Sequence, residues 1–289
     1  MRLEEKATAV STSVAALLVM IKITVGILSG SVAILASAID SFLDLIVSLF
    51  NYFTLHNSNK EADEKFHFGR SKLEPLAAVI EGTVISLSAL FILYEALIKI
   101  IYPQEISYMN ESIGVMIISL VITGGLVFFL NFVANKTNNM VIKADALHYK
   151  TDLFSNGAVL IALFLVSYLH TTLIDPILGI GIAIYMIYSA YPIIKEGILM
   201  LLDAALEQED IQAIQEILAS EEEISSFHDL KTREAGSHIF ISVHIVFDTD
   251  ISLYDAHTIS DKIEEKIKQH FQEKETHILI HMDPYDDSK

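Results

Sequence analysis

Six apolar stretches fill the first two hundred residues and decide what this chain can fold into. A helix needs roughly 20 apolar residues to cross the hydrocarbon core of a bilayer. Each stretch is about that long, and the fourth contains no charged side chain. The sequence therefore predicts six membrane-spanning helices, at about 7–29, 32–56, 76–101, 113–135, 144–169 and 173–194.

The composition narrows the class of protein further. Apolar residues make up 52% of the chain and its mean hydropathy is +0.48, which is too apolar for a soluble enzyme of this size. A net charge of −18 excludes nucleic acid as a partner, which would need a basic surface, and favours something cationic. With no cysteine, any bound metal must be held by His, Asp and Glu.

Basic residues indicate the orientation of the predicted spans, because positively charged short loops stay in the cytoplasm. They cluster before the first span, between the second and third, and between the fourth and fifth, whereas the loops near 30, 102–112 and 170–172 carry none. Both termini are therefore predicted to be cytoplasmic. The first span is full length and runs into a turn at Gly30-Ser31 without a cleavage signature, so we expect it to remain as a helix rather than be removed as a signal peptide.

The last part of the chain has a different character. From residue 201 onward it holds 21 of the 37 acidic residues, 7 of the 19 basic residues and 7 of the 11 histidines, a local net charge of −14. Periodicity predicts helices at 208–220 and 252–271 and strands at 227–235, 238–248 and 276–283. We expect two domains: a polytopic six-helix transmembrane transport domain over 1–203 and a cytoplasmic α+β domain of αββαβ, ferredoxin-like type over 204–289.

Two pairs of ionisable residues lie inside predicted spans. Asp40 and Asp44 are four residues apart in the second span, and His148 and Asp152 are four apart in the fifth, so each pair shares one helix face. Such groups are costly in hydrocarbon and should face one another or a wet cavity. At about 1.5 Å per residue, the first pair lies about 12 and 18 Å from the outer face and the second about 24 and 18 Å. The overlap in depth predicts one four-ligand cluster.

Three carboxylates and one imidazole suit a divalent metal ion. The donor set fits zinc, with ferrous iron, cobalt and cadmium as near competitors. When the metal leaves, close carboxylates cannot all stay ionised, so protons must replace it. His148 is the natural proton carrier, because imidazole titrates at about pH 6.5. We expect Asp145 to be a charge at the cytoplasmic mouth rather than a fifth ligand.

Other interpretations of these charges stay open at this point. The groups could hold helices together, or Asp40 and Asp44 could sit protonated along a water path. An intramembrane aspartyl protease also needs two buried Asp residues, but no Gly-x-Gly-Asp motif, which such enzymes share, occurs here. A metal sensor or scaffold that binds without transporting is a third alternative, and flux measurement would separate it from a transporter.

The DxxxD and HxxxD motifs, the six spans, the Asp175-Pro176 step opening the sixth span and the αββαβ tail together resemble the cation diffusion facilitator family. The resemblance covers nearly the whole chain, and the Asp-Asp/His-Asp quartet is similar to the zinc and iron branch. It implies a homodimeric proton antiporter, not an enzyme, that exports divalent cations. It also implies that helices one, two, four and five surround the site, with three and six at the dimer side. We expect a multi-pass protein of the bacterial inner (plasma) membrane.

The same resemblance assigns metal ligands in the tail, where zinc would also bind. It implies a cytoplasmic two-metal site. Histidines 238, 270 and 277 match no family position, and we expect them to be solvated. The implied ligands are His228, His244, His257, His281 and Asp283.

The loop between the second and third spans departs from the family pattern. Relatives often carry an Asp and two histidines there, whereas Phe66 and Arg70 stand at the histidine places in this chain. Because a guanidinium repels a cation, Asp63 and the displaced His67 are weak candidate ligands and we expect no metal site in this loop. Elsewhere, Lys72 and Asp203 stand at places that resemble a charge pair tying the membrane dimer to the tail.

Overall fold

Two compact units make up this computed structural model, Met1–Ile198 and Leu199–Lys289. The structure describes residues 2–29, 32–102, 110–169, 174–272 and 274–286. The turn expected at Gly30-Ser31 lies outside the described residues. The predicted domain boundary at 203/204 stays a prediction.

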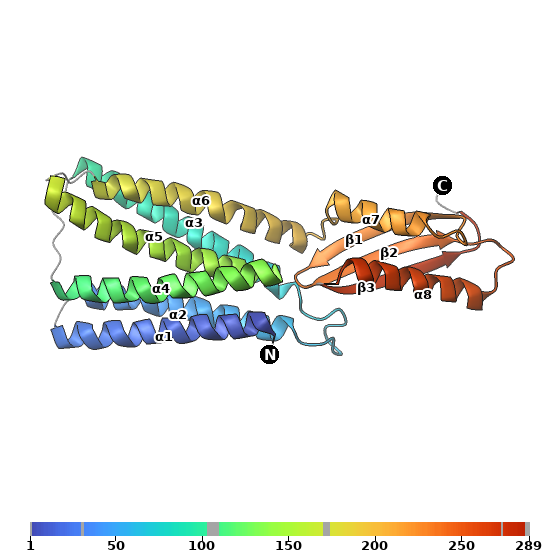
Figure 1. Cartoon of the computed structure of the whole chain (residues 1–289), viewed down its shortest axis with the longest axis horizontal. Coiled ribbons are helices and arrows are strands. Elements are labelled where there is room, and N and C mark those ends of the chain that lie inside the picture. Colours follow the sequence, from blue (N-terminus) through green and yellow to red (C-terminus); the bar gives the residue numbers. More distant parts are fainter. Residues whose placement is uncertain (1, 30–31, 103–109, 170–173, 273, 287–289) are drawn as a thin grey trace. The chain divides into compact units, whose positions relative to one another are not determined.

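The first unit contains the long helices that the apolar stretches predict (Figure 1). Within the described residues, five of these helices are long and apolar enough to cross a membrane. The exception is the helix over 140–169, whose first half carries four charged side chains. The predicted fold class is confirmed. The helices are α1 (Leu3–Ser29), α2 (Val32–Ser58), α3 (Leu73–Ile101), α4 (Asn110–Thr137), α5 (Met140–Leu169) and α6 (Ile174–Leu201).

The distribution of side chains in this unit is the reverse of that in a soluble protein. Large apolar groups point outward, such as Leu28 at 82% exposed and Phe128 at 79%. Polar and charged groups lie inside, among them Asn51 and Glu74 at 0% and 1% exposed. A bilayer solvates apolar surface and forces polar groups to find partners within the protein. The helices are therefore built for a lipid environment.

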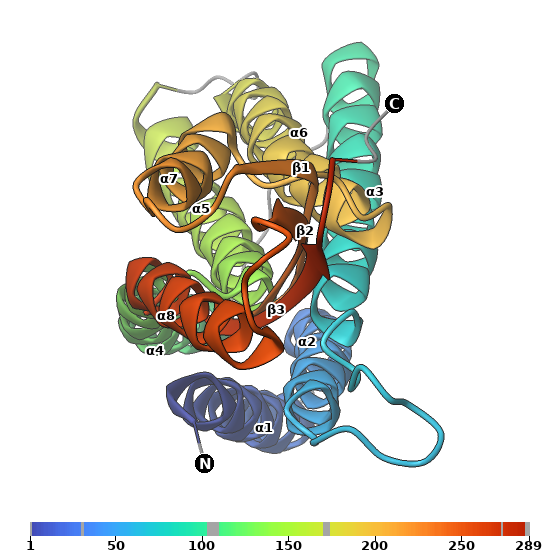
Figure 2. The ribbon, with the colours of Figure 1, turned by 90° about the vertical axis from the view of Figure 1, so that its right-hand side faces the viewer.

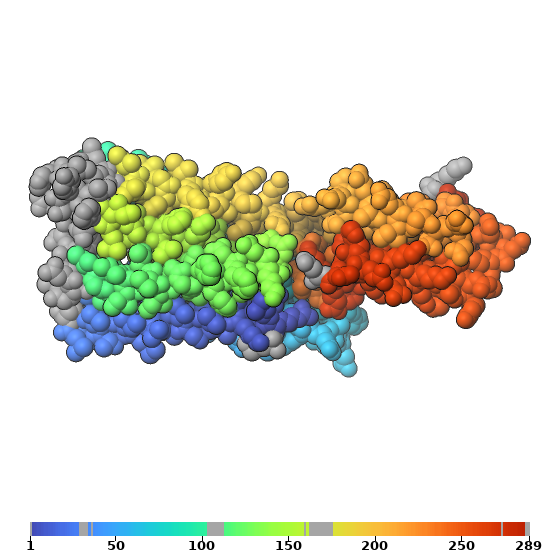
Figure 3. Space-filling model, viewed as in Figure 1, coloured from blue at the N-terminus to red at the C-terminus, as the bar shows by residue number. Residues whose placement is uncertain are grey.

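The helices pack as pairs that position the inner polar groups. Helix α1 packs on α2 and α4, and α5 packs on α4, α3 and α2; on the face seen in Figure 3, α4 lies between α1 and α5. Helices α3 and α6 lie side by side (Figure 2) and approach closely at Gly197. A Cβ atom there would come within 2.6 Å of Val79 Cγ2 and 3.0 Å of the Pro75 carbonyl oxygen.

Two asparagines form the turn that fixes the start of α5. Asn138 has a φ of 54° and its N–H donates to the Ala134 carbonyl at 2.8 Å, which closes the C-terminus of α4. The Asn139 side-chain oxygen accepts from the N–H groups of Val141 and Ile142 at 3.0 and 3.3 Å, as an N-cap does. This cap sets where His148 falls, about two turns into the helix.

The second unit has the predicted αββαβ order. Its sheet has the strand order β1-β2-β3, with β1 and β2 antiparallel and β2 and β3 parallel. The parallel pair requires a crossover, which the second helix provides. The elements are α7 (Gln208–Ala219), β1 (Ser226–Ala235), β2 (His238–Val246), α8 (Leu253–His270) and β3 (Glu275–Asp283).

Alternation along β2 separates a core face from an open face. Its odd-numbered residues are buried at 0–2% exposure, while its even-numbered residues from His238 to His244 are only partly buried. Helices α7 and α8 lie on the same side of the sheet (Figure 2), so the histidines of β2 lie on the side away from them. The core includes Ile214, Leu218, Ile239, Ile241, Val243, Ile245, Ile263 and Ile267.

The close approach of α6 to α3 gives a stability prediction. Gly197→Ala should lower the thermal unfolding midpoint in detergent, since the new methyl meets backbone and overpacking costs about 1–3 kcal/mol. Gly181→Ala on the same helix is the matched control, because nothing lies within 4 Å of its Cβ position and alanine favours a helix. Equal midpoints for the two variants would contradict the tight contact.

Candidate functional site

A cluster of three ionisable side chains lies inside the helical unit. His148 Nε2 of α5 lies 3.3 Å from Asp44 Oδ1 of α2 and 3.7 Å from Asp152 Oδ2. One ligand atom of each residue lies within 4.8 Å of the others. Asp152 Oδ2 is buried without a hydrogen-bond partner. The structure therefore brings three of the four predicted membrane residues together.

A buried hydrogen bond holds the two helices of this cluster in register. The hydroxyls of Ser48 and Tyr149 lie 2.7 Å apart, with Ser48 one turn after Asp44 and Tyr149 adjacent to His148. Tyr149 is 1% exposed, so this bond is sheltered from competing solvent. It fixes the height of α5 against α2, and with it the meeting of the two motifs.

The fourth predicted residue, Asp40, is exposed and lies outside the cluster of three. It is one helical turn before Asp44 on the same face of α2. Its carboxylate still interacts electrostatically with the carboxylate of Asp44 and with the ammonium group of Lys22. The side chain is thus near the cluster without joining it.

Lys22 of α1 is a residue that the sequence analysis missed. It is 7% exposed, and its Nζ donates to Ser41 Oγ at 2.7 Å and to the Ser37 carbonyl at 3.4 Å. Its charge interacts with those of Asp44 and Asp152. A positive group beside several carboxylates reduces their mutual repulsion. The available signal was a lone lysine within an otherwise apolar span.

The expectation for Asp145 is wrong. Its side chain is fully buried rather than at a cytoplasmic mouth, because α2 and α3 both pack against this part of α5. Asn51 Nδ2 donates to Asp145 Oδ1 at 3.2 Å and to Glu81 Oε2 at 3.0 Å. Glu81, at 3% exposed, was also missed, although it interrupts the apolar third span.

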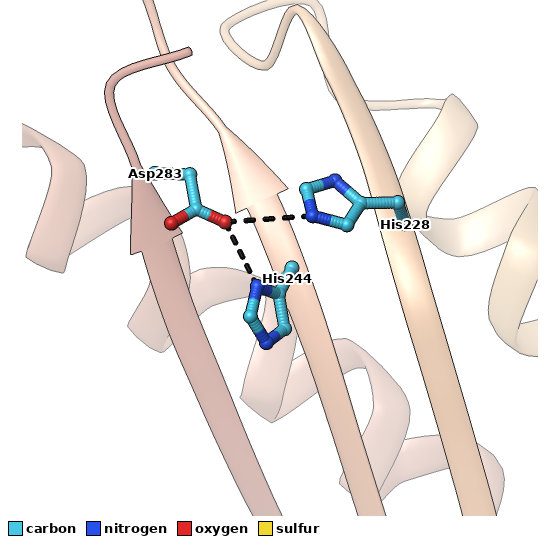
Figure 4. Close-up of side chains that lie close together, drawn as sticks. All are labelled: His228, His244 and Asp283. Atoms are coloured by element: carbon cyan, nitrogen blue, oxygen red, sulfur yellow. Dashed lines mark hydrogen bonds and ion pairs between the residues drawn. The ribbon is translucent and has the colours of Figure 1, made fainter. Parts of the chain in front are cut away.

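A second cluster lies on the open face of the tail sheet. Figure 4 shows the side chains of His228, His244 and Asp283 pointing toward one another from β1, β2 and β3. Asp283 Oδ2 lies 2.9 Å from His244 Nδ1 and 3.7 Å from His228 Nε2. His281 pairs with His244 in the sheet register, and its Nε2 lies 3.1 Å from Asp283 Oδ1. Four of the five predicted tail ligands therefore gather here.

A β-bulge in β1 aligns the first of these histidines. The register shifts between His228 and Lys231, where Asp229 has a φ of 52°, so β1 holds one residue more than β2 over this stretch. His228 thereby stands directly opposite His244. The Lys231 ammonium donates to Asp229 at 2.7 Å, and this hydrogen bond holds the pKa of Asp229 below its ordinary value.

The remaining tail histidines do not join this cluster. His257 of α8 is exposed, with Nε2 3.7 Å from Asp261. His238 and His277 meet at 3.0 Å beside Glu275 at the other end of the sheet. His238 is partly exposed and His277 is exposed, and the expectation that both are solvated stays a prediction.

The loop after α2 is closed by its own ion pair. The Arg70 guanidinium donates to Asp63 Oδ2, and the backbone N–H groups of Lys65 and Phe66 donate to Oδ1 at 2.9 Å. The hydrogen bond from Arg70, followed by those from the backbone, lowers the pKa of Asp63. The exposed His67 ring lies 3.2 Å from the Glu64 carbonyl. A guanidinium thus already binds the one carboxylate of this loop that the sequence analysis considered as a ligand.

The two residues of the predicted dimer charge pair belong to different units. Lys72 precedes α3, and Asp203 follows α6 in the second unit. Within that unit, Arg233 Nη1 donates to Asp203 Oδ1 at 3.0 Å. The pair of Lys72 with Asp203 stays a prediction.

Comparisons with known proteins agree with this arrangement. Residues 8–202 match the family model of the cation efflux transmembrane domain, and residues 206–285 match that of the cation efflux protein cytoplasmic domain. The cation-efflux pump FieF of Salmonella typhimurium strain LT2 is 38% identical over 283 residues, 98% of this chain and 93% of the relative. The FieF pump of Salmonella paratyphi A is 37% identical over the same shares.

Among solved structures, the zinc form of a putative zinc transporter, CzrB, is 30% identical, covers 29% of this chain and 96% of its own, and has a TM-score of 0.26. Two matching domain models and a relative that spans nearly the whole chain show the family. This removes the protease alternative, because the family consists of transporters. The chain is a multi-pass cation efflux transporter and belongs to the cation diffusion facilitator family.

Proposed function

We propose that this chain exports zinc from the cytoplasm in exchange for protons, with ferrous iron, cadmium and cobalt as alternative cargo. The cluster of Asp44, His148 and Asp152 carries the proposal, because its donor atoms lie within 4.8 Å of one another between two helices of the membrane unit. One imidazole nitrogen and carboxylate oxygens suit these borderline ions better than magnesium or calcium, which prefer oxygen alone.

Asp40 is the fourth ligand in this proposal. It lies one turn along the same face of α2, so a rotation of its side chain toward Asp44 would complete a tetrahedral shell. The ammonium of Lys22 stays beside the carboxylates without being a ligand, because a protonated amine has no lone pair to donate.

Proton exchange follows from the charge left behind when the cation departs. Carboxylates held this close in a medium of low dielectric cannot all remain ionised. Protons from the far side would neutralise them and occupy the lone pair of His148, which then no longer binds metal. Entry of protons therefore favours release of the cation, and loss of protons restores the site.

We propose a homodimer in the bacterial inner membrane, with both termini in the cytoplasm. The basic loops support this orientation, and α3 and α6 would face the dimer axis, with Lys72 and Asp203 pairing the two parts. In the tail, zinc would bind at His228, His244, His281 and Asp283. His257 lies apart from that cluster and would serve a second metal position.

Metal flux in reconstituted vesicles is the test of this function. Each of the four ions is supplied on one side against an imposed pH gradient, and counter-movement of protons is followed with a trapped dye. A chain that bound zinc without any flux would be a sensor or scaffold instead.

The first functional prediction concerns the ligands themselves. Asp44→Ala or His148→Ala should reduce zinc flux to the background of empty vesicles, because either change leaves an incomplete shell and unpaired carboxylates. Both variants should stay folded and dimeric by size-exclusion chromatography. His56→Ala is the matched control, an exposed histidine on α2. Wild-type flux in either ligand variant would make the cluster merely structural.

A second prediction concerns selectivity. His148→Asp replaces the nitrogen donor with oxygen and creates an all-oxygen site, which favours harder ions such as manganese. Competitive flux of zinc and manganese should then shift toward manganese. A constant ratio of the two fluxes would mean that the imidazole plays no part in selection.

A third prediction concerns the tail. Its net charge of −14 over residues 201–289 makes two copies repel, so zinc bound at the histidines should tighten the dimer. Sedimentation of the 206–289 fragment should show stronger association with zinc at pH 7.5. The effect should fade as the pH is lowered, because protonated imidazole cannot bind metal.

The controls for the tail are two further variants. The double change His257→Ala with Asp283→Ala should abolish the response to zinc, whereas His270→Ala, on the same helix as His257, should leave it intact. Association that ignored zinc in the unchanged fragment would leave the tail as a dimer clamp without metal.

A further inference from the structure

Three polar side chains from three helices meet at a place that the transport cluster does not use. Asn51 of α2 donates from one amide nitrogen to Glu81 Oε2 of α3 and to Asp145 Oδ1 of α5, at 3.0 and 3.2 Å. These residues are 0%, 3% and 0% exposed. Two carboxylates are thus held within reach of a single amide group in the interior of the membrane unit.

Each of these side chains also has an oxygen atom without any partner. Asn51 Oδ1, Glu81 Oε1 and Asp145 Oδ2 are buried and accept no hydrogen bond. Buried polar atoms are normally satisfied, since an unmet acceptor costs free energy. No ion pair with Lys or Arg is seen for Glu81 or Asp145 among the described residues. Three oxygens without a hydrogen bond and two carboxylates without a Lys or Arg partner are the surroundings that a cation requires.

The position of the three residues relates them to the transport cluster. Asn51 follows Asp44 by seven residues on α2, which places it on the same face about 10 Å further along. Asp145 precedes His148 by three residues on α5 and lies on the same face, about 4.5 Å away. The bonded hydroxyls of Ser48 and Tyr149 lie between the two levels.

The inference rests on the proposed function for the direction in which the cation moves. If the α4–α5 turn faces the cytoplasm, the three residues lie between the cytoplasm and the transport cluster. We infer that Asn51, Glu81 and Asp145 form a transit site that binds the divalent cation on its way from the cytoplasm to Asp44, His148 and Asp152. An all-oxygen site holds zinc less strongly than one containing imidazole. The cation therefore passes from the transit site to the cluster of Asp44, His148 and Asp152.

The surrounding charges fit a transit site rather than a storage site. Glu81 and Asp145 both interact electrostatically with His148, and Glu81 also interacts with Asp152. A cation held at the transit site therefore feels the carboxylates of the next site. The Ser11 hydroxyl of α1 lies beside Asp145 and adds a neutral polar contact.

Isosteric amides test the inference without disturbing the packing. Glu81→Gln combined with Asp145→Asn removes both charges but keeps an oxygen to accept from Asn51 Nδ2. The KM for zinc flux in vesicles should rise about tenfold or more, while the thermal midpoint stays the same or increases. Glu95→Gln is the matched control, because Glu95 is a partly buried residue elsewhere on α3. This variant should leave KM unchanged.

A binding measurement separates this inference from the proposed function. In the full chain carrying Asp44→Ala and His148→Ala, equilibrium dialysis counts the Cd²⁺ ions bound per chain with and without the amide pair. The amide pair should remove about one ion per chain, whether or not the wild type transports. An unchanged count would overturn the transit site. An unchanged KM with an altered pH dependence of flux would also overturn it and would assign the pair to protons.

Discussion

The cost of placing charge in hydrocarbon governs the helical unit. An ionised group without a partner there costs several kcal/mol, so polar side chains on separate helices must meet. The contact between Ser48 and Tyr149 joins α2 to α5, and the contact between Asn139 and Glu74 joins the turn before α5 to α3. These bonds fix rotation and height, which apolar contacts alone do not, because apolar side chains can slide against one another.

The same constraint would set the charge of the proposed transport site, which consists of the cluster of Asp44, His148 and Asp152 together with Asp40. Asp40, Asp44 and Asp152 carry three negative charges when ionised, and Lys22 cancels one of them. The remaining two equal the charge of one divalent cation when the imidazole is neutral. Removing that cation leaves a site that cannot persist unprotonated in a low dielectric. In the proposed function, coupling between metal and protons would therefore arise from electroneutrality, without any contact between the cation and the protons.

Sequence patterns predicted the helices and the placement of each pair of ionisable residues on one helix face. Both follow from local properties, namely length, apolarity and four-residue spacing. The patterns could not predict the burial of Asp145, which depends on α3 packing across α5 at Glu81. The alignment of His228 with His244 depends on an extra residue at Asp229, and strict alternation would place His228 on the other face. Such features are set by tertiary contacts and by local backbone geometry.

The loop after α2 and the tail place a carboxylate in two different settings. In the loop the partner is the fixed positive charge of an arginine, and in the tail it is a group of histidines that could share a metal ion. Arg70 lowers the pKa of Asp63 from its ordinary value of 3.8, so this interaction stabilises the loop above that pH and is lost only as the pH falls through the lowered value. Arg70 thus keeps the loop closed at neutral pH. Asp283 instead faces His228, His244 and His281, and an imidazole binds metal only while it is neutral. Metal bound in the tail would therefore respond to cytoplasmic pH and metal level, whereas the loop would not.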